Sequence, residues 1–265
     1  RRSTRAKRRL LALLAEPKPG ATIQAATRGL RTGAPRKRSG VAWLGEVPAH
    51  WEGMALRRVT LERCDGPFGS GLKSNHYADS GVRVIRLQNI GHAVFRDTDT
   101  AYIPEEHYSL LGNHDVVAGD LLIAGLGDER HPAGRACVAP LGIEPAMVKA
   151  DCFRFRLAAN RLTPEFAALQ LTATAADAAS ILSSGATRQR TNLYATLGRS
   201  VAVPPLDEQL VIVAFLREVL MSVDRTRSVV EREVDLLREY RTRLIADVVT
   251  GQVDVGDMLD VAGGQ

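Results

Sequence analysis

A heptad repeat near the C-terminal end of the chain is the feature that most constrains its fold. Eleven positions from Val213 to Val248 follow one another at alternating spacings of 3 and 4 residues, and nine of them are apolar. The two exceptions are Arg227 and Arg241. Since this spacing brings side chains onto one stripe of a helix, it predicts a long helix with a continuous apolar seam.

Proline and glycine mark the two ends of this helix. A proline pair stands at 204–205 and Gly251 closes the pattern, so we assign 204–251 to one long helix, which is followed by a polar tail at 252–265. At about 1.5 Å per residue, a helix of this length extends roughly 65 Å. Such a helix cannot bury its seam against a compact domain, so we expect a second helix as its partner.

The expected interface with that partner helix is formed by the apolar positions of the seam. They are Val213, Leu216, Leu220, Val223, Val230, Val234, Leu237, Leu244 and Val248. Two other arrangements stay open at this point: an amphipathic helix that lies on its own domain, and a simple homodimeric zipper.

The first 39 residues are predicted to form a basic linker. Residues 1–40 hold 12 Lys and Arg but only one acidic residue, Glu16, so the net charge of +5 has its origin here. A basic segment of this kind either binds phosphate or is simply solvated.

The linker also carries an echo of the long helix. The stretch that begins at Leu13 aligns with the stretch that begins at Leu236, and Thr27 then matches Thr250. This similarity, if it is not chance in a leucine-rich stretch, makes the linker a remnant of an earlier copy of the helix. We expect that copy to be damaged, because prolines at 17 and 19 followed by Gly20 would break a helix.

The middle of the chain, 40–203, is predicted to be one mixed α/β domain. Short apolar or alternating runs predict strands, and a threonine followed by proline at 163–164 predicts the start of a helix that reaches about Leu182. The predicted strands cover 82–87, 121–124, 136–138 and 153–157.

No assembled catalytic or metal site is recognisable in the sequence. The glycine-rich loop at 66–74 resembles a phosphate-binding loop, but Leu72 stands where lysine must follow glycine directly. The histidines are scattered, and the three cysteines, Cys64, Cys137 and Cys152, are not at zinc-site spacing. We therefore expect a binding module without a metal, with reduced thiols in a cytoplasm. The sequence has no run of 18 apolar residues, so we expect no membrane partner.

Basic and amide side chains form clusters that could contact DNA. Arginine can bond guanine through two hydrogen bonds, and asparagine or glutamine can do the same with adenine. Each cluster also has an ordinary alternative as a solvated loop. The candidate DNA-binding residues are Lys73, Ser74, Asn75, Arg86, Gln88, Asn89, Arg130, Arg135, Arg188, Gln189, Arg190 and Asn192.

A series of ordered motifs resembles the specificity subunit of type I restriction-modification systems, over nearly the whole chain. Each motif alone is weak, but their order and spacing together are specific. The motifs are SGVAWLGEVPAHW at 39–51, DGPFGSGLK at 65–73, GVRVIRLQNI at 81–90, GDLLI at 119–123 with GRA at 134–136, GATRQRTNL at 185–193, PPLDEQ at 204–209, and LLREYRTRLI at 236–245 before the TG at 250–251.

This resemblance implies a non-catalytic adaptor. Full-length members of the family carry two target-recognition domains, each reading one half of a split DNA site, and two long spacer helices that pack antiparallel and dock the modification subunits. The resemblance places a target-recognition domain at 40–203 and one spacer helix at 204–251. It therefore implies the second half of a longer subunit, or a natural half-subunit that pairs with itself or with another half.

The same resemblance assigns the chemistry and the cofactors to partner subunits. S-adenosylmethionine is expected on the methyltransferase subunits, and ATP and Mg²⁺ on the restriction motor subunit, which this chain would contact only indirectly. The partner expected for the chain itself is double-stranded DNA, together with the methyltransferase subunits. The alternative from another functional class is a coiled-coil dimerisation protein whose globular domain binds a protein or a small ligand.

Overall fold

The computed structural model describes residues 19–182 and 189–251 of the chain. Two compact units are present: the first runs from Pro19 to Leu216, and the described part of the second begins at Arg217 within the last helix. The helices are α2 (Pro19–Arg28), α3 (Glu105–Leu111), α4 (Pro164–Ala173), α5 (Ala175–Leu182), α6 (Leu193–Gly198) and α7 (Leu206–Val249). The strands are β1 (Arg36–Arg38), β2 (Glu46–Pro48), β3 (Glu52–Ala55), β4 (Thr60–Cys64), β5 (Val82–Ile85), β6 (Tyr102–Ile103), β7 (Asp115–Val116), β8 (Leu121–Ala124), β9 (Leu126–Gly127), β10 (Ala136–Val138), β11 (Ala146–Val148), β12 (Cys152–Leu157), β13 (Gln189–Arg190) and β14 (Ser200–Val203).

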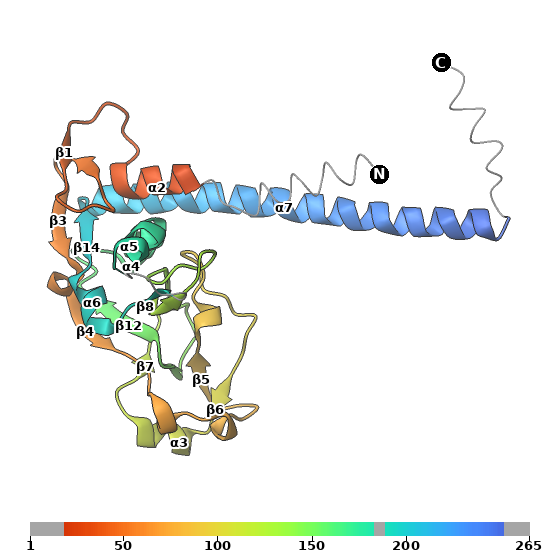
Figure 1. Ribbon diagram of the computed structural model, residues 1–265, viewed down its shortest axis with the longest axis horizontal. Coiled ribbons are helices and arrows are strands. Elements are labelled where there is room, and N and C mark those ends of the chain that lie inside the picture. Colours follow the sequence, from red (N-terminus) through yellow and green to blue (C-terminus); the bar gives the residue numbers. More distant parts are fainter. Residues whose placement is uncertain (1–18, 183–188, 252–265) are drawn as a thin grey trace. The chain divides into compact units, whose positions relative to one another are not determined.

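Two four-stranded sheets form the centre of the first unit (Figure 1). One sheet has the order β10-β8-β12-β4 and is antiparallel throughout. The other has the order β6-β5-β11-β7, in which β5 and β11 run parallel. A mixed α/β domain followed by one long helix, as predicted from the sequence, is therefore confirmed.

Strand β8 shows how the layers are held together. Its side chains alternate between the two faces of the sheet. Leu121 and Ile123 belong to a core that includes residues of α4, whereas Leu122 and Ala124 belong to a second core that includes residues of β5 and β11. One four-residue strand thus separates a helical layer from the second sheet, and every side chain in it is buried.

The helix predicted over 163–182 is two helices. Thr163 caps the first, its Oγ1 accepting a hydrogen bond from the backbone N–H of Phe166, and Pro164 occupies the first turn as expected. The prediction of a single helix was wrong at Thr174. There the backbone leaves the helical region, and both the N–H and the hydroxyl of Thr174 bond to the carbonyl of Gln170.

The long C-terminal helix is confirmed as one unbroken element, α7, of 44 residues. Asp207 and Glu208 lie in its first turn, where negative charge is favourable beside the exposed backbone N–H groups. Of the predicted strands, β8 and β10 have the expected bounds. The strand predicted over 82–87 stops at Ile85, because a 3-10 turn, η4 (Leu87–Asn89), follows it.

Pro19 and Gly20, which the sequence suggested would break a helix, stand at the start of one, and the stretch before them lies outside the described residues. Both lie in the first turn of α2, where proline is tolerated because its missing N–H would have no helical partner. Helix α2 contacts α4, and the compact unit therefore begins at Pro19, upstream of the boundary at 40 that the sequence suggested.

Helix α2 ends in the same way as α7, which supports the internal echo. The hydroxyl of Thr27 donates to the carbonyl of Ile23, as that of Thr250 donates to the carbonyl of Ala246. A glycine in the left-handed region follows each threonine, with φ of 73° at Gly29 and 72° at Gly251. The leucine pair of the first copy lies outside the described residues.

Candidate nucleic-acid interface

Arg135 is the residue that holds the candidate interface together. Its Nε donates to the carbonyl of Ile90 (2.8 Å) and its Nη2 to that of Leu87 (3.0 Å), while its Nη1 reaches the carbonyls of Leu126 (2.9 Å) and His131 (3.0 Å). The side chain is buried, and burial lowers its pKa. Five N–H donors in a planar fork suit such a cluster of carbonyls better than any other side chain does. Arg135 therefore anchors the loops of the interface and, in this structure, is unavailable for a base contact.

The three candidate residues of the first cluster, at 86–89, differ in how far the structure buries their side chains. Asn89 is fully buried: its amide donates to the carbonyls of Arg96 and Asp99 and accepts from the backbone N–H of Arg86. Arg86 is partly exposed, forms an ion pair with Asp99, and lies over the ring of Tyr77 at 5.9 Å. Gln88 is exposed. Among the three candidates, Asn89 supports the turn and Gln88 faces solvent.

The second cluster contributes Arg130 at an exposed turn. Asp128 organises this turn, because its Oδ1 accepts from the backbone N–H groups of Arg130 (2.8 Å) and His131 (2.7 Å). Those bonds lower the pKa of Asp128 and keep its carboxylate charged. Arg130 itself is exposed.

The third cluster, at 189–192, is joined to the segment of the second cluster by pairing of strands β13 and β9. Gln189 pairs with Gly127 and Arg190 with Leu126, and the Gln189 side chain accepts from the backbone N–H of Ala133 (3.1 Å). Arg190 bonds to Asp151 at 3.0 Å and keeps 62% of its side chain exposed. Asn192 is exposed, but its side chain caps α6. Arg188 lies outside the described residues.

Gln88, Arg130 and Arg190 therefore come from segments that the structure joins directly, although together they span about a hundred residues of sequence. We call these three residues the loop face. Lys73, Ser74 and Asn75 are exposed as well, on a loop that is connected to this face through Tyr77 beneath Arg86. The ring of His76 contacts that of His107 in α3, with centroids 4.0 Å apart and ring planes tilted by 49°.

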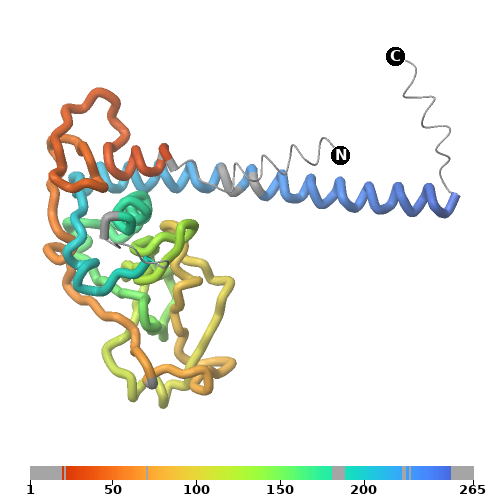
Figure 2. The backbone as a smooth tube through the Cα atoms, viewed as in Figure 1, coloured from red at the N-terminus to blue at the C-terminus, as the bar shows by residue number. Residues whose placement is uncertain are grey.

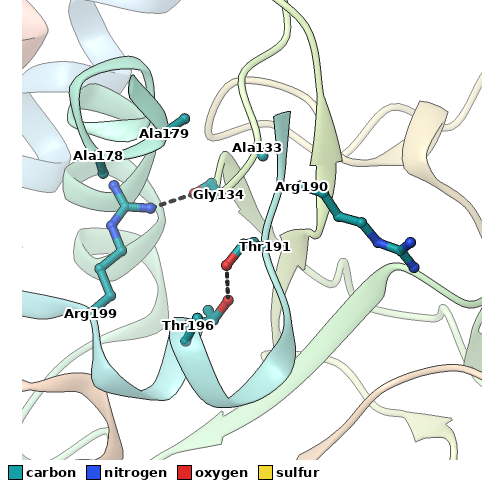
Figure 3. Close-up of a pocket in the computed structure, with 9 residues that line it drawn as sticks. Ala133, Gly134, Ala178, Ala179, Arg190, Thr191, Thr196 and Arg199 are labelled. Carbon is teal, nitrogen blue, oxygen red and sulfur yellow. Dashed lines mark hydrogen bonds between the residues drawn. The ribbon is translucent and has the colours of Figure 1, made fainter. Parts of the chain in front are cut away.

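A small cavity beneath the loop face admits no nucleobase. It lies between Gly134, Arg199 and the Thr191–Thr196 pair (Figure 3), and its volume of about 20 Å³ is enough for one water molecule. Arg199 points into this region and bonds to the carbonyls of Gly134 (2.9 Å) and Leu171 (2.6 Å), and burial lowers its pKa to about 10. Sequence reasoning did not single out Arg199, which is a second buried arginine held by main-chain carbonyls.

Two arginines on strand β12 form a network of ion pairs on one face of the first sheet. Arg154 and Arg156, on β12, share Glu62, Asp115 and Asp120 through several bonds, of which Arg156 Nε to Asp120 Oδ1 is 2.9 Å. Since these charges neutralise one another, this network does not form a basic patch. The alternation of arginine with phenylalanine at 153–156 was the sequence signal for it.

The seam of α7 has two different environments. Val213 and Leu216 lie in the core around Trp51 and Phe166, so their own domain buries them rather than the partner helix expected from the sequence. Farther along, Val230 and Val234 are buried, while the seam residues Leu220, Leu237, Leu244 and Val248 are partly buried. The side chain of Val223 lies outside the described residues.

The described residues contain no group of three metal-ligating side chains and no helix long and apolar enough to cross a membrane. The three cysteines are free thiols, and burial raises the pKa of Cys64 to about 11 and that of Cys137 to about 12. These thiols stay protonated near neutral pH and are poor nucleophiles.

Comparison with known proteins gives a consistent result. No family model matches the chain. A type I restriction enzyme specificity subunit, MjaVIII from Methanocaldococcus jannaschii, is 21% identical over 225 residues, which are 81% of this chain and 49% of that protein. The chain thus spans about half the length of this curated relative.

Of two matches among solved structures, one shows the same fold. A structure that describes complex assembly and conformational transition of a type I restriction-modification system matches with a TM-score of 0.62 at 18% identity, over 93% of this chain and 55% of the other. The HsdS subunit of Thermoanaerobacter tengcongensis matches with a TM-score of 0.49 at 17% identity, over 90% and 54% of the two chains. The curated relative confirms the resemblance to type I specificity subunits that the ordered motifs predicted, and the structure with the TM-score of 0.62 shows the same fold.

Proposed function

We propose that this chain is a specificity subunit, or half of one, of a type I restriction-modification system, and that its domain reads one half of a bipartite DNA site. In this proposal the chain carries out no catalysis itself. It brings methyltransferase subunits, which bind S-adenosylmethionine, to the DNA site that it recognises. A motor subunit that uses ATP and Mg²⁺ would join the same assembly through those partners.

The loop face is the observation that carries this proposal. Gln88 in η4, Arg130 at a turn and Arg190 in β13 are all exposed, and the buried Arg135 and the β9–β13 pairing hold these segments at fixed positions. Amide and guanidinium groups are the side chains that read adenine and guanine edges. Preorganised loops lower the entropy lost on binding, which suits recognition of one defined sequence.

A domain exchange tests the proposal. The chain is co-expressed with its modification subunits, the compact unit Pro19–Leu216 is replaced by the equivalent segment of another specificity subunit, and methylated sites are mapped across a genome. We expect the methylated sequence to change in one half of the site. Methylation at unchanged sites would refute the proposal, and stable self-association without retention on DNA would favour the dimerisation protein instead.

Single substitutions at the loop face give a finer test. Arg190→Ala should cost roughly 1–3 kcal/mol of binding to the recognised sequence and relax the preference at one base pair, if its guanidinium reads a base. Arg161→Ala is the matched control, because Arg161 is a similarly exposed arginine paired with a carboxylate, that of Glu52 at 3.4 Å. Binding is measured by fluorescence anisotropy on cognate and scrambled duplexes. An equal loss on both duplexes would assign Arg190 to a phosphate.

A further inference from the structure

A concave basic surface lies on the first unit apart from the loop face. Its floor is the two-stranded ribbon of β3 and β14, in which Val201 pairs with Met54 and Ala202 with Gly53. The β1–β2 hairpin forms one wall, and a 3-10 turn, η1 (Leu56–Arg58), forms the other. The hollow has a volume of about 350 Å³. Figure 2 shows the early chain segments of this hollow, in orange, beside the late β14, in cyan.

Four basic side chains line this hollow: Lys37 and Arg38 from the hairpin, and Arg57 and Arg58 from η1. We call these four residues the basic groove. All four are exposed, and none forms an ion pair with any residue that the structure describes. The described lining residues include no carboxylate.

This lack of counter-charge distinguishes the basic groove from other arginines of the unit. Arg83, Arg86, Arg154 and Arg156 each form an ion pair with an aspartate or glutamate. Several like charges gathered in a concave site raise the local positive potential and attract an anion. Glu46, which pairs with Arg38 across the hairpin, forms no ion pair with it and does not line the hollow.

The walls of the groove are firmly supported. Leu56 is fully buried and its backbone N–H donates to the carbonyl of Arg199 at 2.9 Å, so η1 is held in place while Arg57 and Arg58 remain in solvent. On the floor, a Cβ atom added at Gly53 would meet nothing within 4 Å, which leaves the main chain open to close approach. The site is therefore preorganised and accessible.

We propose that the basic groove binds the sugar-phosphate backbone of double-stranded DNA, an inference that rests on the proposed function and adds a second contact to it. A repeating phosphate backbone matches several unpaired cations that have no fixed hydrogen-bond partners. Of the larger apolar lining residues, Leu44, Val47 and Met54 are buried and Val41 is partly exposed. Consequently the groove offers little of the exposed apolar surface that anchors a protein partner. Base reading belongs to the loop face, and the groove contributes affinity without sequence preference.

The test measures the salt dependence of binding to a labelled random-sequence duplex by the full chain. Two variants remove groove charges, Arg57→Ala/Arg58→Ala and Lys37→Ala/Arg38→Ala. The matched control, Arg31→Ala/Arg36→Ala, removes the same charge from exposed residues of the same basic region that do not line the groove. Thermal melting confirms that each variant is folded.

The slope of log K against log salt is negative, and we expect its magnitude to decrease by about 1 for each phosphate contact removed. Each groove variant should therefore show a slope that is shallower by about 2. The control should leave the slope unchanged. An equal fall in the control would reduce the effect to bulk charge and overturn the proposal, as would an unchanged slope in both groove variants. Groove-dependent binding of poly-glutamate in preference to the duplex would instead assign the groove to an acidic protein.

These outcomes are separable from those of the domain exchange. If methylation sites fail to follow the exchanged domain while groove variants still lose salt dependence, the proposed function falls and the groove remains a phosphate site. If the sites follow the domain but the groove variants behave like the control, the groove proposal alone falls.

Discussion

Helix α7 contains two stretches that share one sequence pattern and differ in what buries them. In the first, Leu206–Leu216, the seam residues Val213 and Leu216 join Ile212 in the domain core. In the second, from Arg217 onward, the seam residues Val230 and Val234 are buried without belonging to that core, and Leu220, Leu237, Leu244 and Val248 are only partly buried. The comparison teaches that a heptad pattern predicts a helix and an apolar stripe, but not the surface that will cover the stripe.

The largest expected effect comes from truncating the same side chain in the two stretches. Leu216→Ala removes a fully buried side chain from the core and should lower the free energy of unfolding by about 2–5 kcal/mol. Leu236→Ala, in the second stretch, should change it by no more than about 0.5 kcal/mol because that side chain is exposed. Urea unfolding followed by tryptophan fluorescence measures both. Equal losses would mean that Leu236, beside the seam, is buried as Leu216 is.

The side chain of Gln209 holds the first stretch of α7 against the domain. Its replacement by alanine should have an intermediate effect on the free energy of unfolding. Its fully buried amide accepts from the backbone N–H of Thr163 (2.8 Å) and donates to the carbonyls of Arg161 and Pro204, each at 2.9 Å. Gln209→Ala should destabilise the domain by roughly 3 kcal/mol, since each buried backbone group left without a partner costs about 1–3 kcal/mol.

The control for Gln209 is Glu231→Ala, at an exposed position of the second stretch. It should leave the urea midpoint of the tryptophan signal within error. A midpoint for Gln209→Ala that matches this control would show that the start of α7 is not fixed by its amide bonds.

The smallest expected effect is a pH dependence in the free energy of unfolding of the domain that buries the first stretch. Burial raises the pKa of Asp65 from 3.8 to about 6, so the folded state holds this proton more tightly than the unfolded state does. The protonated Asp65 therefore stabilises the folded state. This contribution is fully present below about pH 3.8 and is lost as the pH rises through 6. After allowance for partial exposure, about 1–2 kcal/mol should be lost.

Asp65→Asn should remove this pH dependence because a side-chain amide does not titrate, while its oxygen can still accept the hydrogen bond from the N–H of Gly66. Urea midpoints at several pH values between 4 and 7 measure the difference between the two proteins. Tryptophan fluorescence reports the domain and far-ultraviolet circular dichroism reports the helices, so non-coincident transitions would show that the second stretch of α7 unfolds separately. Parallel pH profiles for both proteins would contradict the role given to Asp65.

The sequence predicted best where the pattern is local and repeated. The long helix, β8 and the capped start of α4 follow from spacing and from residues such as Thr163 and Pro164. The interruption at Thr174 and the end of β5 at Ile85 were not predicted, because each depends on a single residue's backbone conformation within an otherwise regular run.

The candidate site was predicted only as a list of residue types. Sequence placed Asn89 and Arg135 beside Gln88 and Arg130 as equivalent candidates, whereas the structure buries the first two and exposes the others. Burial of a polar side chain depends on carbonyls supplied by distant segments, and no local pattern records them. For the same reason the unpaired state of Arg57 and Arg58 became visible only in three dimensions.

The anchoring of Arg135 has a consequence for how such a domain can diversify. All its hydrogen-bond acceptors are main-chain carbonyls, which every residue type possesses. Side chains at Leu87, Leu126 or His131 can therefore be exchanged without deleting a single acceptor. Arg135 therefore holds these loops in place whatever side chains they carry. New exposed side chains could evolve on the loops while the backbone that supports them stays the same.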